Sequence, residues 1–256
     1  LKLDEEKGAT LAIDIGTNSE IMLSTREGLV TTSAASGPAF EGGNITFGMT
    51  AGRGAIEDVT IKGDDVKVSS IGNAVPVGIC GSGIVSVMAE LLKSGIMDST
   101  GRIKSKGEIP TNLACRIKEG SSGNGFILFK GAKAEIIVSQ DDVRAFQVAK
   151  AAIRAGMEVL FERAKVAPDK IEKVLVAGAF GSKLKKDSLE TIGLFDREWN
   201  EKIEVSGDAA LEGAKMALLS DESKKKAEGI AASAKYVPLS GSRLFEKRFI
   251  ENMNFS

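Results

Sequence analysis

Three short segments of this chain combine glycine with residue types that can contact a phosphate group or hold a cation. The first is Asp14–Asn18 (DIGTN), in which Gly16 lets the backbone approach an anion while Thr17 and Asn18 add donors. Asp14 ends an apolar run, a position from which a carboxylate can hold the water shell of Mg²⁺. We therefore predict Asp14 as the catalytic and metal-binding residue, and Gly16, Thr17 and Asn18 as nucleotide-binding residues. An ordinary hairpin turn with a capping aspartate is the alternative.

The other two segments each lead from an apolar run into the start of a predicted helix. A helix N-terminus presents free amide groups and a partial positive charge, so a nucleotide can lie against glycine backbone there. The nucleotide-binding residues predicted on this basis are Gly178, Ala179, Phe180, Gly181 and Ser182 in one segment and Gly81, Ser82 and Gly83 in the other. For each segment, a tight strand-to-helix connection without a ligand is the alternative.

The composition excludes several kinds of site. None of the 256 residues is histidine, which excludes a Ser-His-Asp triad and any His metal ligand within the chain. Cys80 and Cys115 are too few for an iron–sulfur cluster, and we expect reduced thiols in a cytoplasmic protein, with a disulfide or a cluster shared between subunits as the alternative. Lys and Arg number 34 against 35 Asp and Glu, and no apolar run approaches the ~20 residues of a membrane span. We therefore expect neither a nucleic-acid nor a membrane partner.

The spacing of apolar residues predicts the elements that position these segments. A hairpin spans residues 11–25 with the Gly-Thr-Asn turn at its tip, and a buried helix follows the glycines near residue 81. Ser139 and Asp142 have the spacing of a capping box, which predicts the start of an amphipathic helix that ends near Ala164. Further strands and βα units are predicted at residues 29–33, 59–61, 66–70, 126–129, 135–138, 173–184, 202–220 and 235–253. Hairpins followed by βα units, twice over, predict an α/β fold with two lobes.

The domain organisation that we predict has three parts. Residues 1–8 are a linker remnant, residues 9–125 are lobe one, and residues 126–256 are lobe two with a C-terminal helix. Residues 36–59 form a long Gly-rich insertion in lobe one, and loops of this length are usually binding or closing elements. Its candidate anchors for a partner are Pro38, Phe40 and Met49. Packing of the insertion on its own domain is the alternative.

A phosphate hairpin near the start and a Gly-rich adenosine segment in the second half resemble the superfamily of actin, sugar and acetate kinases and heat-shock chaperone ATPases. The resemblance implies two ribonuclease-H-like lobes of the actin/acetate and sugar kinase type, with a cleft between them for ATP and Mg²⁺. The second DxGxT hairpin of that superfamily has no obvious counterpart here. Residues 139–141 or 81–83 are the candidates to replace it.

A narrower resemblance, to the reductive activators of corrinoid proteins of the O-demethylase activating enzyme type, extends over nearly the whole chain. The blocks that carry it are Ala12–Ile21, Ser33–Ile45, Gly78–Ile84, Ser139–Gly156, Val176–Ser182 and Gly207–Leu219. One departure is Asp208, where we expect asparagine; both residues cap a helix. The resemblance implies that this chain is a C-terminal ATP-binding domain, and that a [2Fe-2S] cluster lies in an N-terminal domain outside these residues. The start at Leu1 rather than methionine agrees with that expectation.

The resemblance also implies a function, namely the ATP-dependent return of an inactive Co(II) corrinoid cofactor to Co(I) in methyltransferase or O-demethylase systems. The implied partners are a corrinoid protein and the protein's own N-terminal iron–sulfur domain, and a homodimer is left open. Glu41 and Asp58 are both candidates to position the attacking water, and the sequence does not choose between them. The alternatives are a small-molecule kinase of the same fold and a non-catalytic nucleotide-sensing docking module.

Overall fold

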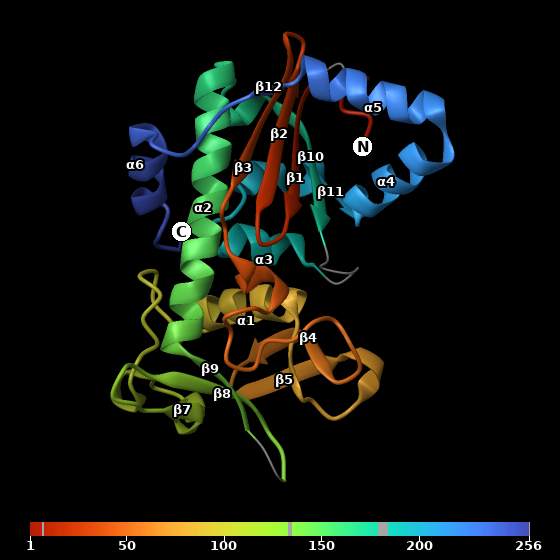
Figure 1. Ribbon diagram of the computed structural model, residues 1–256. Helices are drawn as coiled ribbons and strands as arrows, with labels where there is room; N and C mark the ends of the chain where they lie inside the picture. Colours follow the sequence, from red (N-terminus) through yellow and green to blue (C-terminus); the bar gives the residue numbers. More distant parts are fainter. Residues whose placement is uncertain (7, 133–134, 179–183, 256) are drawn as a thin grey trace.

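The computed structural model describes residues 1–6, 8–132, 135–178 and 184–255, and these form a larger and a smaller part (Figure 1). The larger part is built on a six-stranded sheet with helices around it. The smaller part, residues 55–139, contains one α-helix, short 3-10 turns and two three-stranded sheets among its described residues. Among the described residues, no helix is long and apolar enough to cross a membrane.

The larger sheet has the strand order β11-β10-β1-β2-β3-β12. Its strands are β1 (Ala9–Ile15), β2 (Ser19–Thr25), β3 (Gly28–Ala34), β10 (Ile171–Gly178), β11 (Ile203–Gly207) and β12 (Lys235–Tyr236). Strand β1 is antiparallel to β2, which confirms the predicted hairpin, and parallel to β10, which is in turn parallel to β11. The carboxyl ends of β1, β10 and β11 therefore lie at the same edge, which is where open α/β sheets bind ligands.

This strand order differs from the predicted division of the chain at residue 125. The predicted boundary separates residues 9–34 from residues 171–207. In the structure both segments contribute strands to one sheet, in which β1 pairs directly with β10. The predicted linker remnant, residues 1–8, also makes contacts with the sheet. Leu3 is buried against Ala12 and Leu175, and its carbonyl oxygen accepts a hydrogen bond from the Ser24 hydroxyl.

The smaller part holds two sheets of three strands each, rather than a second sheet of the larger kind. One has the order β5-β4-β6 and the other the order β7-β8-β9. Their strands are β4 (Ala55–Lys62), β5 (Asp65–Ser70), β6 (Gly78–Ile79), β7 (Ile117–Lys118), β8 (Gly125–Lys130) and β9 (Glu135–Ser139). The hairpin predicted around residues 63 and 64 is confirmed as β4 and β5, and the strands predicted at 126–129 and 135–138 are confirmed as β8 and β9.

The helices are α1 (Gly81–Lys93), α2 (Gln140–Ala164), α3 (Lys186–Thr191), α4 (Ala209–Leu219), α5 (Asp221–Ser233) and α6 (Arg243–Glu251). Helix α2 starts beside β9 in the smaller part and continues along the larger sheet, where it packs on β2, β3 and α6 (Figure 1). The predicted capping box at its start is confirmed. The Ser139 hydroxyl accepts the Asp142 N–H, and the Asp142 carboxylate accepts the Ser139 N–H.

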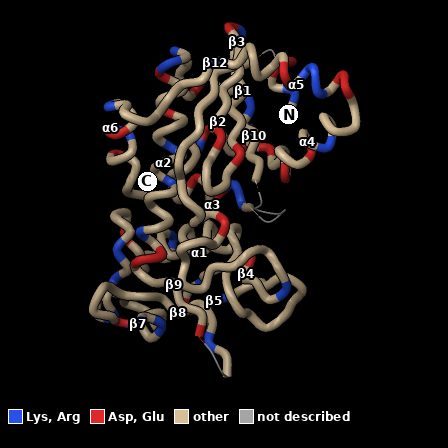
Figure 2. Tube along the Cα trace, viewed as in Figure 1, with Lys and Arg blue, Asp and Glu red and all other residues tan. Residues whose placement is uncertain are grey.

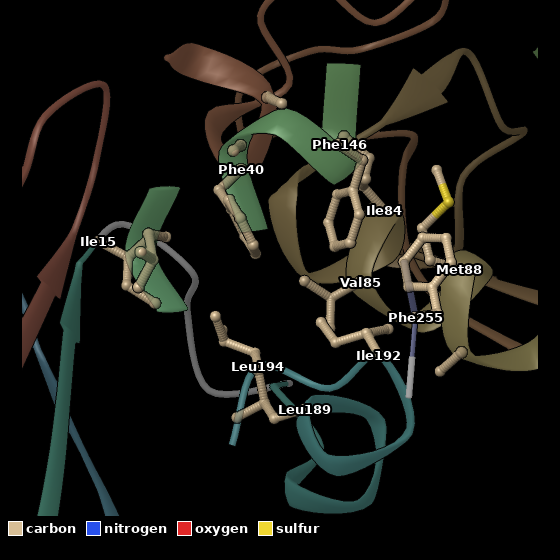
Figure 3. Packing of buried hydrophobic residues seen from close by; sticks show 14 of the residues in the cluster. Ile15, Phe40, Ile84, Val85, Met88, Phe146, Leu189, Ile192, Leu194 and Phe255 are labelled. Carbon is tan, nitrogen blue, oxygen red and sulfur yellow. The ribbon is translucent and has the colours of Figure 1, made fainter. Parts of the chain in front are cut away.

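One hydrophobic cluster extends through both parts (Figure 3). Phe40 lies in a short helical turn, η1 (Pro38–Glu41), and its ring centroid is 4.8 Å from that of Phe146 on α2. Only 1% of Phe40 is exposed, so it is a core residue rather than an anchor for a partner. Ile45 and Ile56 belong to the same cluster, and these contacts agree with the alternative that the insertion of residues 36–59 packs on its own domain.

Candidate functional site

Asp14 lies at the carboxyl end of β1, half-buried and opposite Glu20 on β2. Burial raises the pKa of Asp14 above its usual value, and the negative charges of Glu20 and Asp208 raise it further. Asp208 follows β11 directly and caps α4, where its carboxylate accepts the Leu211 N–H at 2.9 Å. A cation beside Asp14 would offset this negative charge, so the site fits the Mg²⁺-related role predicted for Asp14.

The described residues contain no group of three or more acidic, His or Cys side chains arranged to hold a metal ion. Mg²⁺ usually keeps several water ligands and takes the rest from one or two carboxylates and the phosphates of its nucleotide. Asp14 therefore fits a Mg²⁺ ion that arrives bound to a nucleotide, and does not by itself provide a complete cation site.

The turn of residues 16–18 is held by hydrogen bonds to its carbonyl groups. The Ser36 hydroxyl donates to the Gly16 carbonyl oxygen at 2.9 Å, and the Gly37 N–H donates to the Thr17 carbonyl oxygen at 2.8 Å. Ser36 also lies 2.8 Å from the hydroxyl of Ser19, and both serines are buried. The N–H groups of Thr17 and Asn18 take no part in these bonds, and both residues are exposed. This arrangement fixes the carbonyl side of the turn and leaves Thr17 and Asn18 exposed at its tip.

Glu41 and Asp58, which the sequence left as equal candidates, have different surroundings. The Thr17 hydroxyl donates to Glu41 Oε2 at 2.5 Å, so Glu41 faces the predicted phosphate turn. Asp58 on β4 accepts hydrogen bonds from the Ser86 hydroxyl and from Lys185 Nζ, each at 2.7 Å. Both carboxylate oxygens of Asp58 thus accept hydrogen bonds from residues outside the turn.

Of the segment predicted to bind adenosine, residues 178–182, the structure describes only Gly178. Gly178 is the last residue of β10 and pairs with Ile15 of β1, so it lies beside the end of the strand that carries Asp14. Its φ of 124° is a backbone conformation that favours glycine. Ala179, Phe180, Gly181 and Ser182 lie outside the described residues.

Gly81, Ser82 and Gly83 open α1 as predicted, and all three are buried. The Ser82 hydroxyl donates to the Glu57 carbonyl oxygen, and a Cβ on Gly83 would lie 2.1 Å from the Ile56 carbonyl oxygen. These contacts with β4 favour a tight strand-to-helix connection over a ligand-binding role. Residues 139–141 are also used locally, because Ser139 caps α2 and the Gln140 amide bonds the backbone of residues 101 and 103.

The sequence did not indicate Ser19 and Ser36 as parts of the site. Each is an ordinary polar residue beside a strand end, and only the pairing of β2 with β3 brings Ser19 and Ser36 together. Lys185 was missed for a similar reason, because its partner Asp58 lies in the other part of the molecule. No local spacing in the sequence signals either contact.

Comparisons with known proteins agree with this geometry. Residues 8–256 match a protein family described as the C-terminal domain of RACo, the ASKHA domain. The chain is 33% identical over 262 residues to the corrinoid activation enzyme RamQ of Eubacterium limosum, an alignment that covers 100% of this chain and 44% of that protein. It is 28% identical over 206 residues to the Co(II) methylated amine-specific corrinoid protein reductase of Methanosarcina barkeri, which covers 72% of this chain and 34% of the relative.

A solved structure, that of a reductive activator for corrinoid, iron-sulfur protein, superposes with a TM-score of 0.90 at 36% sequence identity. The superposition covers 99% of this chain and 40% of that one, so the chain spans less than half the length of the relatives it matches. The predicted fold class, an α/β domain of the actin-like ATPase type, is confirmed by this match and by the family. The chain belongs to the family of the C-terminal ASKHA domain of RACo.

Proposed function

We propose that this chain is the ATP-binding part of a reductive activator, which uses ATP to reduce Co(II) corrinoid to Co(I) in a corrinoid protein of a methyltransferase or O-demethylase system. The match of residues 8–256 to the RACo family carries this proposal. The relatives named above are activators or reductases of corrinoid proteins, and the turn after β1 has the features of a phosphate site. These observations support an activator over a small-molecule kinase or a docking module.

In the proposed site, the turn of Gly16, Thr17 and Asn18 binds the phosphates, and Ser36 holds this turn in place. Asp14 would hold water ligands of a Mg²⁺ ion that accompanies ATP, and such an ion would supply positive charge to offset the negative charge of the phosphates. We assign the adenosine and α-phosphate to the segment that begins at Gly178, which lies at the end of β10 beside β1.

The proposed coupling follows from the energetics of the reduction. Formation of Co(I) takes one electron, which we assign to an iron–sulfur domain elsewhere in the full protein, and the step is uphill from such a donor. ATP can shift this equilibrium only if two states of the activator differ in their affinity for the corrinoid protein. We propose that ATP binding favours one of these states and that hydrolysis restores the other.

The test is ATP hydrolysis by the full protein with Mg²⁺, measured with and without a Co(II) corrinoid protein, while the absorbance of Co(I) is recorded. We expect the corrinoid protein to stimulate hydrolysis and Co(I) to form only when ATP is present. ATP turnover that depends instead on an added sugar or carboxylic acid, with transfer of the γ-phosphoryl group to that compound, would indicate a kinase. ATP binding without hydrolysis, even in the presence of the partner, would indicate a docking module.

A further inference from the structure

The carboxylate of Glu41 lies directly at the turn to which we assign the phosphates. Its Oε2 accepts the Thr17 hydroxyl at 2.5 Å, and its Oε1 is 3.7 Å from the position of a Cβ built on Gly16. Glu41 is exposed, so its carboxylate is open to solvent and to a ligand at the turn. A second carboxylate at an anion-binding turn does not help to bind phosphate, because like charges repel. Its presence therefore needs another explanation.

The backbone around Glu41 is held firmly. Phe40, the preceding residue, is buried against Phe146, and η1 packs between α1 and α2. Gly42, the following residue, has a left-handed φ of 89°, and a Cβ there would lie 2.8 Å from the Met49 nitrogen. The Asp142 carboxylate accepts hydrogen bonds from the backbone N–H and the hydroxyl of Thr46. The segment thus keeps Glu41 beside the turn, as a group that takes part in a reaction must be kept.

The other two carboxylates considered for this site, those of Asp14 and Asp58, are less suited to receive a proton from water. Asp14 is half-buried beside two other negative charges, and its proposed role is to hold the water ligands of Mg²⁺. Asp58 has one oxygen on the Ser86 hydroxyl and the other on Lys185 Nζ. Glu41 combines exposure, a fixed backbone and direct contact with a residue of the phosphate turn.

We infer that Glu41 is the catalytic base for ATP hydrolysis, an inference that rests on the proposed function. A water oxygen attacks the γ-phosphorus and forms a new O–P bond, while the bond from the γ-phosphorus to the β,γ-bridging oxygen breaks. The electron pair of that bond leaves with ADP, and the proton of the attacking water passes to the Glu41 carboxylate. The products are ADP and inorganic phosphate, and Glu41 later releases its proton to solvent.

The experiment compares Glu41→Gln with wild type and with Glu27→Gln in the full protein. Glu27 is an exposed glutamate in the turn after β2, at the opposite end of that strand from the site, and serves as the matched control. For each protein we would measure the Kd of MgATP, the kcat and KM of hydrolysis with the corrinoid protein present, and the Tm. We expect Glu41→Gln to lower kcat by about 100-fold or more, the usual contribution of a catalytic base, while Kd and Tm stay near wild type.

A second variant, Glu41→Ala, separates a chemical role from a structural one. Removal of the carboxylate leaves space for a small anion, so added formate should restore part of the lost turnover if a carboxylate is needed only as a proton acceptor. Equal kcat values for Glu41→Gln and wild type would overturn the inference and leave the proposed function intact, as would a loss of ATP binding without a loss of kcat. Failure of the wild-type protein to bind ATP would overturn the proposed function and the inference with it.

Discussion

Asp14 occupies an electrostatically unfavourable position, because its carboxylate is half-buried and lies near the negative charges of Glu20 and Asp208. A carboxyl group with a raised pKa stays protonated in the folded protein at a pH where it is already ionised in the unfolded chain. The folded state then binds more protons than the unfolded state, so this group lowers stability as the pH rises through that interval. The protein keeps a destabilising charge at the place where we propose that a cation-bearing ligand binds.

We therefore predict that Asp14→Asn makes the free protein more stable at pH 7, because it removes the ionised group without changing its shape. The same variant should lose ATP-dependent reactivation of the corrinoid protein and the increase in Tm that MgATP gives to wild type. Thermal unfolding at pH 7 and at pH 3, with and without MgATP, measures both effects. The gain in stability should disappear at the lower pH, where Asp14 is protonated in wild type. A variant that keeps wild-type reactivation would exclude the role proposed for Asp14.

Ser36 offers a second test at this scale, because its hydroxyl ties the Gly16 carbonyl and contacts Ser19. Ser36→Ala removes this partner from the buried Ser19 hydroxyl and from the Gly16 carbonyl oxygen, which should lower the free energy of unfolding by about 1–3 kcal/mol. Part of this cost should appear as weaker MgATP binding, up to about tenfold in Kd, because the turn is no longer fixed. The matched control is Ser33→Ala on β3, whose hydroxyl donates to Glu20 instead. Equal effects of the two variants on Kd would show that the turn does not depend on Ser36.

The elements that were predicted well are those with a local signal. The hairpin of β1 and β2 follows from two apolar runs around a Gly-containing turn, and the start of α2 follows from Ser139 and Asp142. The neighbour of β1 on its other side could not be predicted, because β10 begins only at Ile171 and no local spacing records that pairing. The contact of Glu41 with Thr17 is likewise a property of packing, since it depends on Phe40 being buried against α2.

Glycine substitutions test how tightly these elements pack. Gly83→Ala places a Cβ 2.1 Å from the Ile56 carbonyl oxygen, so α1 must move away from β4, at a cost of about 1–3 kcal/mol. Gly213→Ala, within α4, meets no atom within 4 Å and should stabilise the protein by about 0.5–1 kcal/mol through its helix propensity. Urea unfolding of both variants measures these opposite effects. A neutral Gly83→Ala would mean that α1 is not held closely against β4.

At the scale of the whole molecule, the two parts share one hydrophobic cluster and are also joined by polar contacts. Lys185, which precedes α3, reaches Asp58 on β4 in the smaller part, and α3 packs against α1 (Figure 1). Lys and Arg residues are interspersed with Asp and Glu over both parts (Figure 2), in line with the near-equal totals of 34 and 35. Neither part carries an excess of one charge type that could attract the other. The charge contacts between the parts are therefore specific ion pairs such as Lys185–Asp58.

The side chains of Lys185 and Asp58 are 49% and 22% exposed, so solvent screens their attraction. A double-mutant cycle with Lys185→Met and Asp58→Asn should give a coupling energy of about 0.2–1 kcal/mol, and this coupling should decrease as salt is added. Unfolding in urea at low and high ionic strength measures both quantities. Strictly additive effects of the two substitutions at low salt would show that this ion pair does not connect the parts.

The central position of β1 also affects how the chain is made. A ribosome releases β1, β2 and β3 before β10, and at about 5–20 residues per second the partner strand β10 follows only after many seconds. During that interval one side of β1, in a strand of mostly buried residues, has no partner and can pair with other nascent chains. The yield of native protein should therefore depend on chaperones that bind nascent chains, and on the speed of translation between residues 15 and 171.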